Sequence, residues 1–153
     1  MIVGVGLDLV DIPRIAALLG GDKGARAEAR LFTAGEAAYA RARAEPARHF
    51  AARFAAKEAA YKALAGSEAA RGISWRDVEV AVEWDGRPRL VLHGRAAERA
   101  GALGVARVHV SLTHSDGVAG AVVVLEGWEL GEHVTAAGAP EEAVEAAFGL
   151  LGE

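Results

Sequence analysis

The stretch His-Phe-Ala-Ala-Arg-Phe-Ala-Ala-Lys-Glu-Ala-Ala-Tyr-Lys-Ala-Leu-Ala-Gly, residues 49–66, is the segment around which we expect this 153-residue chain to fold. Alanine and other good helix formers fill it, no Pro interrupts it, and Gly66 stands where a C-terminal cap is expected. Pro46 lies shortly before it, where a first helical turn is often found. We therefore predict one long helix here.

The charges of this helix lie in unusual places. With about 100° between successive residues, Phe50, Phe54 and Tyr61 cluster within about 40° and mark the expected buried stripe. Four charged residues border this stripe, and alanine fills the face expected to point outward: Arg53, Lys57, Glu58 and Lys62. Charges beside a packed face are costly unless they are paired or bind something. The pattern indicates either a plain Glu58–Lys62 surface pair or a binding site.

Residues 2–10 are predicted to form a strand. Apolar residues from Val3 to Leu9 alternate onto one face, whereas Gly4, Gly6 and Asp8 share the other. Two glycines beside an acid leave room for another group to approach the backbone. A dinucleotide-binding fingerprint fits poorly, because Leu9 occupies the place of its third glycine.

The rest of the chain changes character near its middle. The capping box Thr33–Glu36 opens a helix, and Asp85-Gly86 is predicted to turn a hairpin. Helices are expected over 11–19, 22–32, 33 to the low forties and 94–103, and strands over 78–84, 89–93, 107–113 and 118–125. Helices in the first half and antiparallel strands in the second predict an α+β fold, with the long central helix packed against the sheet.

Composition limits the class of protein. The length suits one domain, and the absence of cysteine excludes disulfides and thiolate metal sites. No apolar run approaches the roughly 20 residues that span a membrane, and the N-terminus lacks the pattern of a secretory signal. We therefore expect a cytoplasmic protein with no membrane partner.

Charge is unevenly distributed along the chain. Residues 23–62 carry nine basic and four acidic side chains, whereas residues 126–153 carry seven Glu and no Lys or Arg. We interpret 1–126 as the domain and 127–153 as an acidic C-terminal extension with a short helix from Pro140. The basic middle indicates either an anionic ligand, an acidic partner or a solvated helical surface. Nucleic acid is disfavoured, because the few aromatic residues are used in the expected core.

Asp8 and Glu58 are the residues with the clearest chemical potential. Two carboxylates with open positions hold Mg²⁺ when phosphate oxygens complete its shell. The neighbouring Lys and Arg side chains then supply positive charge for a phosphate ester. His114, at a strand end, is either a ligand contact or an ordinary turn histidine, and Arg14 is either a partner contact or an ordinary surface residue.

Two segments carry a family resemblance: Gly-Val-Gly-Leu-Asp-Leu-Val-Asp-Ile-Pro-Arg-Ile (4–15) and Phe-Ala-Ala-Arg-Phe-Ala-Ala-Lys-Glu-Ala-Ala-Tyr-Lys-Ala (50–63). They resemble the two signatures of the holo-acyl-carrier-protein synthases, the short bacterial-type 4′-phosphopantetheinyl transferases. Three shorter segments fit in the expected order: Leu31-Phe-Thr-x-x-Glu36, Gly86-Arg-Pro-Arg-Leu and Val110-Ser-Leu-Thr-His114. The resemblance covers about residues 1–126.

The resemblance implies a 4′-phosphopantetheinyl transferase-like fold and its reaction. Such enzymes transfer 4′-phosphopantetheine from coenzyme A to a serine of an apo acyl carrier protein and release 3′,5′-ADP. It implies that Asp8 and Glu58 bind Mg²⁺ and that Lys62 assists the departing phosphate. Either Glu58 or a metal-positioned water takes the serine proton.

The resemblance also implies partners and an assembly. The implied coenzyme A contacts are Asp8, Arg53, Lys57, Glu58, Lys62, Gly86, Pro88 and His114, and the implied carrier contact is Arg14. Family members of this length are typically homotrimers with each active site between two subunits, which explains charges at the edge of a packed face. The rival is a module that binds a nucleotide or an acidic protein without chemistry. The pathway that the carrier serves stays open.

Two features depart from the family pattern. Ser115 follows His114 where some relatives carry an acid, and Asp116 lies one position later. The acidic extension is longer than usual, and it either competes with acidic carriers or packs as an appendage.

Overall fold

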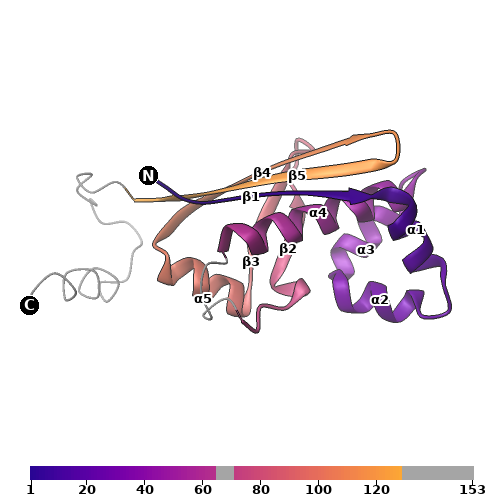
Figure 1. Ribbon diagram of the computed structural model, residues 1–153, viewed down its shortest axis with the longest axis horizontal. Helices are drawn as coiled ribbons and strands as arrows, with labels where there is room; N and C mark the ends of the chain where they lie inside the picture. The colour runs from indigo at the N-terminus through magenta and orange to yellow at the C-terminus, as the bar shows by residue number, and fades with distance from the viewer. Residues whose placement is uncertain (65–70, 129–153) are drawn as a thin grey trace, which may run out of the picture.

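A three-stranded antiparallel sheet carries the long helix on one face in this computed structural model, which describes residues 1–64 and 71–128. The strands lie in the order β1–β5–β4, and Figure 1 shows α4 running beneath them. Their bounds are β1 (Ile2–Asp11), β4 (Val105–Ser115), β5 (Val118–Gly127) and α4 (Pro46–Leu64). This arrangement confirms the predicted α+β fold with a central helix packed on an antiparallel sheet.

The remaining elements lie around α4. Figure 1 shows α1 to α3 at one end of it and α5 toward the other end, where Arg99 Nε donates to Leu64 O at 2.9 Å. A two-stranded antiparallel hairpin, β2–β3, packs beside α4 and β4. The bounds are α1 (Ile12–Gly20), α2 (Gly24–Leu31), α3 (Ala34–Arg41), η2 (Trp75–Asp77), β2 (Val78–Val82), β3 (Pro88–Leu92) and α5 (Gly94–Ala102).

The alanine face of α4 is its packed face, so the prediction that it points outward is wrong. Every alanine of a group of seven is at most 7% exposed: Ala51, Ala52, Ala55, Ala56, Ala59, Ala60 and Ala63. Tyr61, expected in the buried stripe, is 39% exposed, although Phe50 does lie in the core. The reason is the strand opposite. A Cβ on Gly6 would lie 1.8 Å from Ala59 O. The helix backbone therefore packs directly against the backbone of β1 at its glycines, where no side chain separates the two.

The apolar face of β1 therefore points away from the helix. Val5, Leu7 and Leu9 are 58, 61 and 66% exposed, because successive side chains of a strand alternate between faces. Leu7 pairs with Val122 of β5, and Val5 pairs with Val124, which extends this apolar surface onto the next strand. A row of exposed aliphatic residues of this kind marks an interaction surface more often than a solvated one.

Several local predictions are confirmed. The Thr33–Glu36 capping box forms, with Glu36 N donating to Thr33 Oγ1 at 3.2 Å and Thr33 N donating to Glu36 Oε2 at 2.8 Å. Asp11 precedes α1 at the N-cap position, although its side chain makes no capping hydrogen bond. Gly66 and the helix expected from Pro140 lie outside the described residues, as does the acidic extension from residue 129 onward. No helix of the described segments is both long enough and apolar enough to cross a bilayer.

Candidate functional site

Asp8, Glu58 and Lys62 come together at one flank of α4. The close approach of β1 to the helix brings the Asp8 carboxylate to Lys62, whose Nζ lies 2.6 Å from Asp8 Oδ1 and 3.0 Å from Leu7 O. Glu58 lies one turn before Lys62, on the same side of the helix. The two separate sequence segments therefore form one charged cluster.

The charges of the cluster shift the pKa of Glu58. Partial burial raises the pKa of Glu58, and the nearby negative charge of Asp8 raises this pKa further. Lys62 and Arg14 act in the opposite direction on the same pKa. Arg14 projects from the exposed side of α1, so the residue predicted to contact the carrier lies beside the predicted metal ligands.

The donor set suits a hard divalent cation. A carboxylate whose ionised form is disfavoured by a neighbouring carboxylate, as Glu58 is by Asp8, gains from a cation between the two. Within residues 1–64 and 71–128, no group of three or more His, Cys, Asp or Glu side chains is placed to hold a metal. Asp8 and Glu58 are thus a two-carboxylate set, which matches Mg²⁺ when substrate oxygens supply most of its shell.

A separate cavity of about 710 Å³ gathers the residues predicted to contact the nucleotide. Arg53, Gly86, Pro88 and His114 all line it. They come from α4, the β2–β3 hairpin and the end of β4, so three elements distant in sequence build one wall. The size falls within the range of small-ligand pockets.

Arg53 is the buried cation of this cavity. Its side chain is 3% exposed, and its Nη1 donates to His49 O at 3.3 Å. Its Nε is buried and has no hydrogen-bond partner. Burial lowers the pKa of Arg53, yet the guanidinium stays charged near neutral pH. A buried, unsatisfied donor on a cavity wall indicates a ligand acceptor.

The two groups lie on opposite flanks of α4. Arg53 and Glu58 are five residues apart, which places their side chains about 140° apart around the helix axis. Asp8 belongs to the edge strand β1, and His114 belongs to the other edge strand, β4. The chain alone therefore forms two half-sites, defined here as the carboxylate half-site (Asp8, Glu58, Lys62) and the nucleotide half-site (Arg53, Gly86, Pro88, His114).

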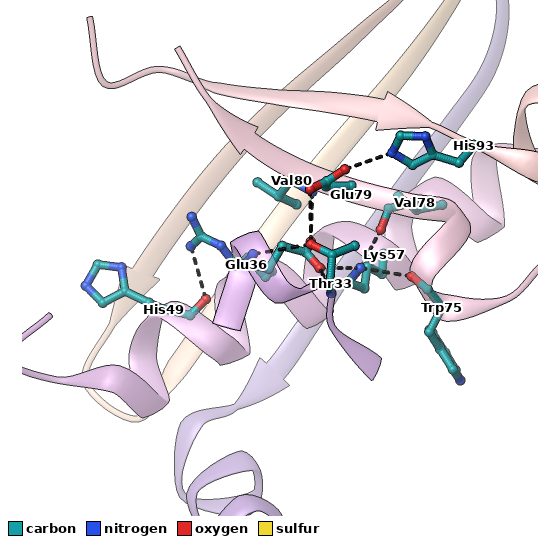
Figure 2. Close-up of polar contacts among 10 residues, drawn as sticks. Thr33, Glu36, His49, Lys57, Trp75, Val78, Glu79, Val80 and His93 are labelled. Carbon is teal, nitrogen blue, oxygen red and sulfur yellow. Dashed lines mark hydrogen bonds and ion pairs between the residues drawn. The ribbon is translucent and has the colours of Figure 1, made fainter. Parts of the chain in front are cut away.

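Lys57 lies in neither half-site. Its side chain is 1% exposed, and its Nζ contacts Glu36 Oε2 at 2.8 Å and Trp75 O at 2.9 Å, as well as the carbonyl of Val78. Figure 2 shows this ammonium enclosed between α3, α4 and the start of β2. Glu36 in turn accepts from Val80 N at 2.8 Å. The sequence could not distinguish this core pair from a ligand contact.

Tyr39, His49 and Trp84 are among the cavity residues that the sequence did not predict. Trp84, at the hairpin tip, is 95% exposed, which is unusual for an indole. Tyr39 is four residues before Arg43 on a predicted helix, and that spacing was the available signal. Ser115 and Asp116 are exposed at the β4–β5 turn and do not line the cavity.

Comparison with known proteins identifies the family. The family model described as the 4′-phosphopantetheinyl transferase superfamily matches residues 4–122. The chain is 53% identical over 130 residues to a holo-[acyl-carrier-protein] synthase of Anaeromyxobacter dehalogenans, covering 83% of this chain and 98% of that protein.

Solved structures agree with this match. The acyl carrier protein synthase of Mycobacterium tuberculosis is 41% identical with a TM-score of 0.60, covering 83% of this chain and 99% of that one. A holo-(acyl-carrier-protein) synthase from Bacillus anthracis, solved in complex with CoA (3′,5′-ADP), is 32% identical with a TM-score of 0.66, covering 84% and 99%. This chain therefore belongs to the 4′-phosphopantetheinyl transferase superfamily.

Proposed function

We propose that this protein is a holo-[acyl-carrier-protein] synthase that transfers 4′-phosphopantetheine from coenzyme A to a serine of an apo acyl carrier protein. The observation that carries the proposal is the meeting of Asp8, Glu58 and Lys62 at one flank of α4. A module that only binds a nucleotide has no need of a carboxylate pair beside a lysine. The transferase domain is proposed to span residues 1–126, of which the family match covers 4–122.

The reaction exchanges one phosphorus–oxygen bond for another. The serine Oγ of the carrier forms a bond to the β-phosphorus of coenzyme A, and the bond from that phosphorus to the bridging oxygen breaks. The leaving group is 3′,5′-ADP, and the serine loses its proton. Catalysis of such a step depends mainly on positioning and on neutralising the developing charge.

Mg²⁺ fits the carboxylate half-site and is proposed as the cofactor. Asp8 and Glu58 would hold it, and when bound it supplies charge neutralisation to the pyrophosphate. The Lys62 ammonium, which lies 2.6 Å from Asp8 Oδ1, would stabilise the oxygen of the departing phosphate. The serine proton passes to Glu58 or to an ordered water.

The nucleotide half-site and Arg14 are proposed to position the two substrates. Arg53 and His114 would contact phosphates of the nucleotide, while Gly86 and Pro88 shape the cavity wall. Lys57 is proposed to be a structural residue, because its ammonium is enclosed by protein oxygens. Arg14 is proposed to meet an acidic surface of the carrier, beside the point where the serine must enter.

A direct assay tests the function. Incubation with coenzyme A, Mg²⁺ and an apo carrier protein is expected to add the mass of phosphopantetheine to the carrier. Asp8→Asn and Glu58→Gln are each expected to lower turnover at least about a hundredfold, because several kcal/mol of charge stabilisation are lost. Lys62→Ala is expected to lower kcat more than it raises the KM for coenzyme A. Near wild-type turnover in Asp8→Asn or Glu58→Gln contradicts the metal assignment.

We further propose a homotrimer with active sites between subunits. The exposed apolar face around Leu7 and the separation of the two half-sites both support an assembly that joins the flank of one copy to the opposite flank of another. Leu7→Glu is expected to give monomers and to abolish transfer, with mass measured by light scattering after gel filtration. Leu18→Glu, on α1 and 44% exposed, is the matched control and should leave the mass unchanged. A monomeric wild type contradicts the proposal.

A further inference from the structure

Four basic side chains and one apolar side chain are exposed on α1, on α2 and in the turn between them, and they define the α1–α2 surface: Arg14, Leu18, Lys23, Arg26 and Arg30. Leu18 is 44% exposed and lies one turn after Arg14, on the same face of α1. A Cβ on Gly24 would lie 1.9 Å from Leu19 O, so α2 begins directly against the end of α1. The two helices therefore adjoin at one end of the molecule, as Figure 1 shows.

The positive charge of this surface is not neutralised by the described part of the chain. None of its four basic side chains forms an ion pair within residues 1–64 and 71–128. Residues 12–31 contain two acids, and one of them, Glu28, is already paired with Arg41 of α3. Arginines of the β2–β3 hairpin differ, since Arg87 pairs with Asp85 and Arg89 pairs with Glu83. An exposed surface of unpaired cations attracts an acidic segment.

The acidic extension carries the complementary chemistry. Residues 129–153 contain six Glu and no Lys or Arg, and they lie outside the family match, which ends at residue 122. Within the helix predicted from Pro140, Glu141 and Glu145 are four residues apart, and so are Val144 and Phe148. The sequence thus predicts acids beside an apolar stripe, which matches the cations beside Leu18.

The extension is long enough to reach the α1–α2 surface of its own chain. The end of β5 at Gly127 is paired with Val105, whereas α1 begins after Asp11, which is paired with Val118 at the other end of β5. The ten residues of β5 span about 30 Å. The twelve residues 129–140 span up to about 40 Å when extended. The segment from Pro140 onward is therefore the part of the extension that can reach α1.

We propose that residues 140–151 dock on the α1–α2 surface of their own chain, with Glu141 and Glu145 against its cations and Phe148 against Leu18. This inference rests on the proposed function in one respect, because Arg14 is also the proposed contact for the acidic surface of the carrier. The docked segment takes the place of the carrier, and residues 140–153 contain no serine that could accept phosphopantetheine. The extension is thus a competitor of the carrier that is tethered to the enzyme.

Weak docking is sufficient for competition because the segment is tethered. A short flexible connection gives an effective concentration of roughly 1 mM, so a docking dissociation constant of about 0.1 mM leaves about one-tenth of the molecules open. The apparent KM for the carrier is then about tenfold higher than that of the open enzyme.

Substitution of the docking acids tests the competition. Glu141→Gln/Glu142→Gln/Glu145→Gln is expected to lower the KM for the carrier about tenfold and to leave kcat and the KM for coenzyme A unchanged. Glu129→Gln/Glu132→Gln/Glu153→Gln removes the same charge outside the docking segment and is the matched control. An unchanged KM for the carrier in the first triple variant, or an equal fall in both, overturns the proposal.

A disulfide trap measures docking without turnover, because the chain has no cysteine of its own. Leu18→Cys/Phe148→Cys is expected to form a disulfide within one chain under mild oxidation, which requires Cα atoms within about 7 Å of each other. Gly101→Cys/Phe148→Cys is the control, because Gly101 is exposed on α5, just before Val105, the partner of Gly127. This control pair should react more slowly, although Gly101 lies nearer to the start of the extension. Mass spectrometry of the linked peptides measures both rates.

The two measurements separate this inference from the proposed function. If the wild type transfers no phosphopantetheine but the Leu18→Cys/Phe148→Cys disulfide forms selectively, the transferase proposal fails and the docking stands. If the wild type is active and this disulfide forms only between chains, or no faster than in the control pair, the docking is overturned and the transferase proposal stands.

Discussion

Two features of its surroundings disfavour the ionised form of the Glu58 carboxyl group: it is partly buried, and it lies close to the charge of Asp8. Both effects raise the pKa of Glu58 above its ordinary value of 4.5. A cation binds only the ionised form, so binding must displace a proton when the pH is low enough for Glu58 to hold one.

Mg²⁺ binding in the presence of coenzyme A is therefore expected to weaken as the pH falls into the region above 4.5 where Glu58 protonates. Titration calorimetry between about pH 5 and pH 7.5, in buffers of different ionisation enthalpy, measures the protons released. Release should increase toward lower pH in the wild type and disappear in Glu58→Gln. An affinity independent of pH over this range contradicts the assignment.

His49 is the second residue whose titration reports on its surroundings. Burial lowers its pKa below 6.5, and Arg53, Arg43, His114 and Arg48 lower it further. Its charged form is disfavoured in the folded state, so folding stability should fall as the pH decreases through 6.5 toward the lower native pKa. Above pH 6.5, His49 is neutral in both the folded and the unfolded state, so it does not lower the free energy of unfolding.

The free energy of urea unfolding at pH 8 and at pH 5.5 tests this expectation. His49→Gln should reduce the loss of stability on acidification, and His109→Gln, on the exposed side of β4, should not. An identical loss in the wild type and in His49→Gln would show that other groups cause it.

Among the elements, α3, α4 and β2 are joined by the buried ion pair of Glu36 and Lys57. Figure 2 shows how the pair reaches Thr33 on one side and the carbonyls of Trp75 and Val78 on the other. Breaking one partner of a buried pair leaves an uncompensated charge, which costs about 3–5 kcal/mol.

Lys57→Met is accordingly expected to lower the free energy of unfolding by about 3–5 kcal/mol while the folded fraction keeps its KM for coenzyme A. The double variant Lys57→Met/Glu36→Gln should lose less than the sum of the two single variants, as measured by urea titration. A raised KM at unchanged stability would return Lys57 to the coenzyme A contacts.

The contact between β1 and α4 is made by backbone rather than by side chains. A Cβ on Gly6 would lie 1.8 Å from Ala59 O, so Gly6→Ala forces the strand and the helix apart. We expect a loss of about 1–3 kcal/mol in unfolding free energy, together with reduced turnover because Asp8 moves. Gly101→Ala, in α5 with open space around it, should be neutral or gain about 0.5–1 kcal/mol. Equal effects of the two substitutions contradict this account.

Elements were predictable from the sequence where local chemistry decides them. The Thr33–Glu36 box, the strand β2 and the helix of residues 49–64 depend on neighbours within a few residues. The packed side of α4 was not predictable in this way. Alanine is compatible with either face, and the choice depends on the glycines of a strand about 50 residues away in sequence.

At the scale of the whole molecule, the motifs predicted candidate site residues but not how the fold groups them. Asp8 and Glu58 were matched from two short segments, and the fold brings them together. That Arg53 faces the other way, and that Lys57 is enclosed, follows from which elements cover each side of α4. Tertiary coverage of this kind is not encoded in the spacing of any one segment.

The separation of the two half-sites has a genetic consequence, which is complementation between mutant alleles of the same gene. If each active site takes its carboxylate half from one copy and its nucleotide half from another, two different null alleles can rescue each other in one cell. Asp8→Asn co-expressed with Arg53→Ala should restore growth where neither supports it alone, since about one site in three of each mixed trimer, or roughly a quarter of all sites, then combines two intact halves. Asp8→Asn with Glu58→Gln, both on one flank, should never complement. A gene that encodes a single polypeptide would thus behave as two complementation groups, divided along the axis of one helix.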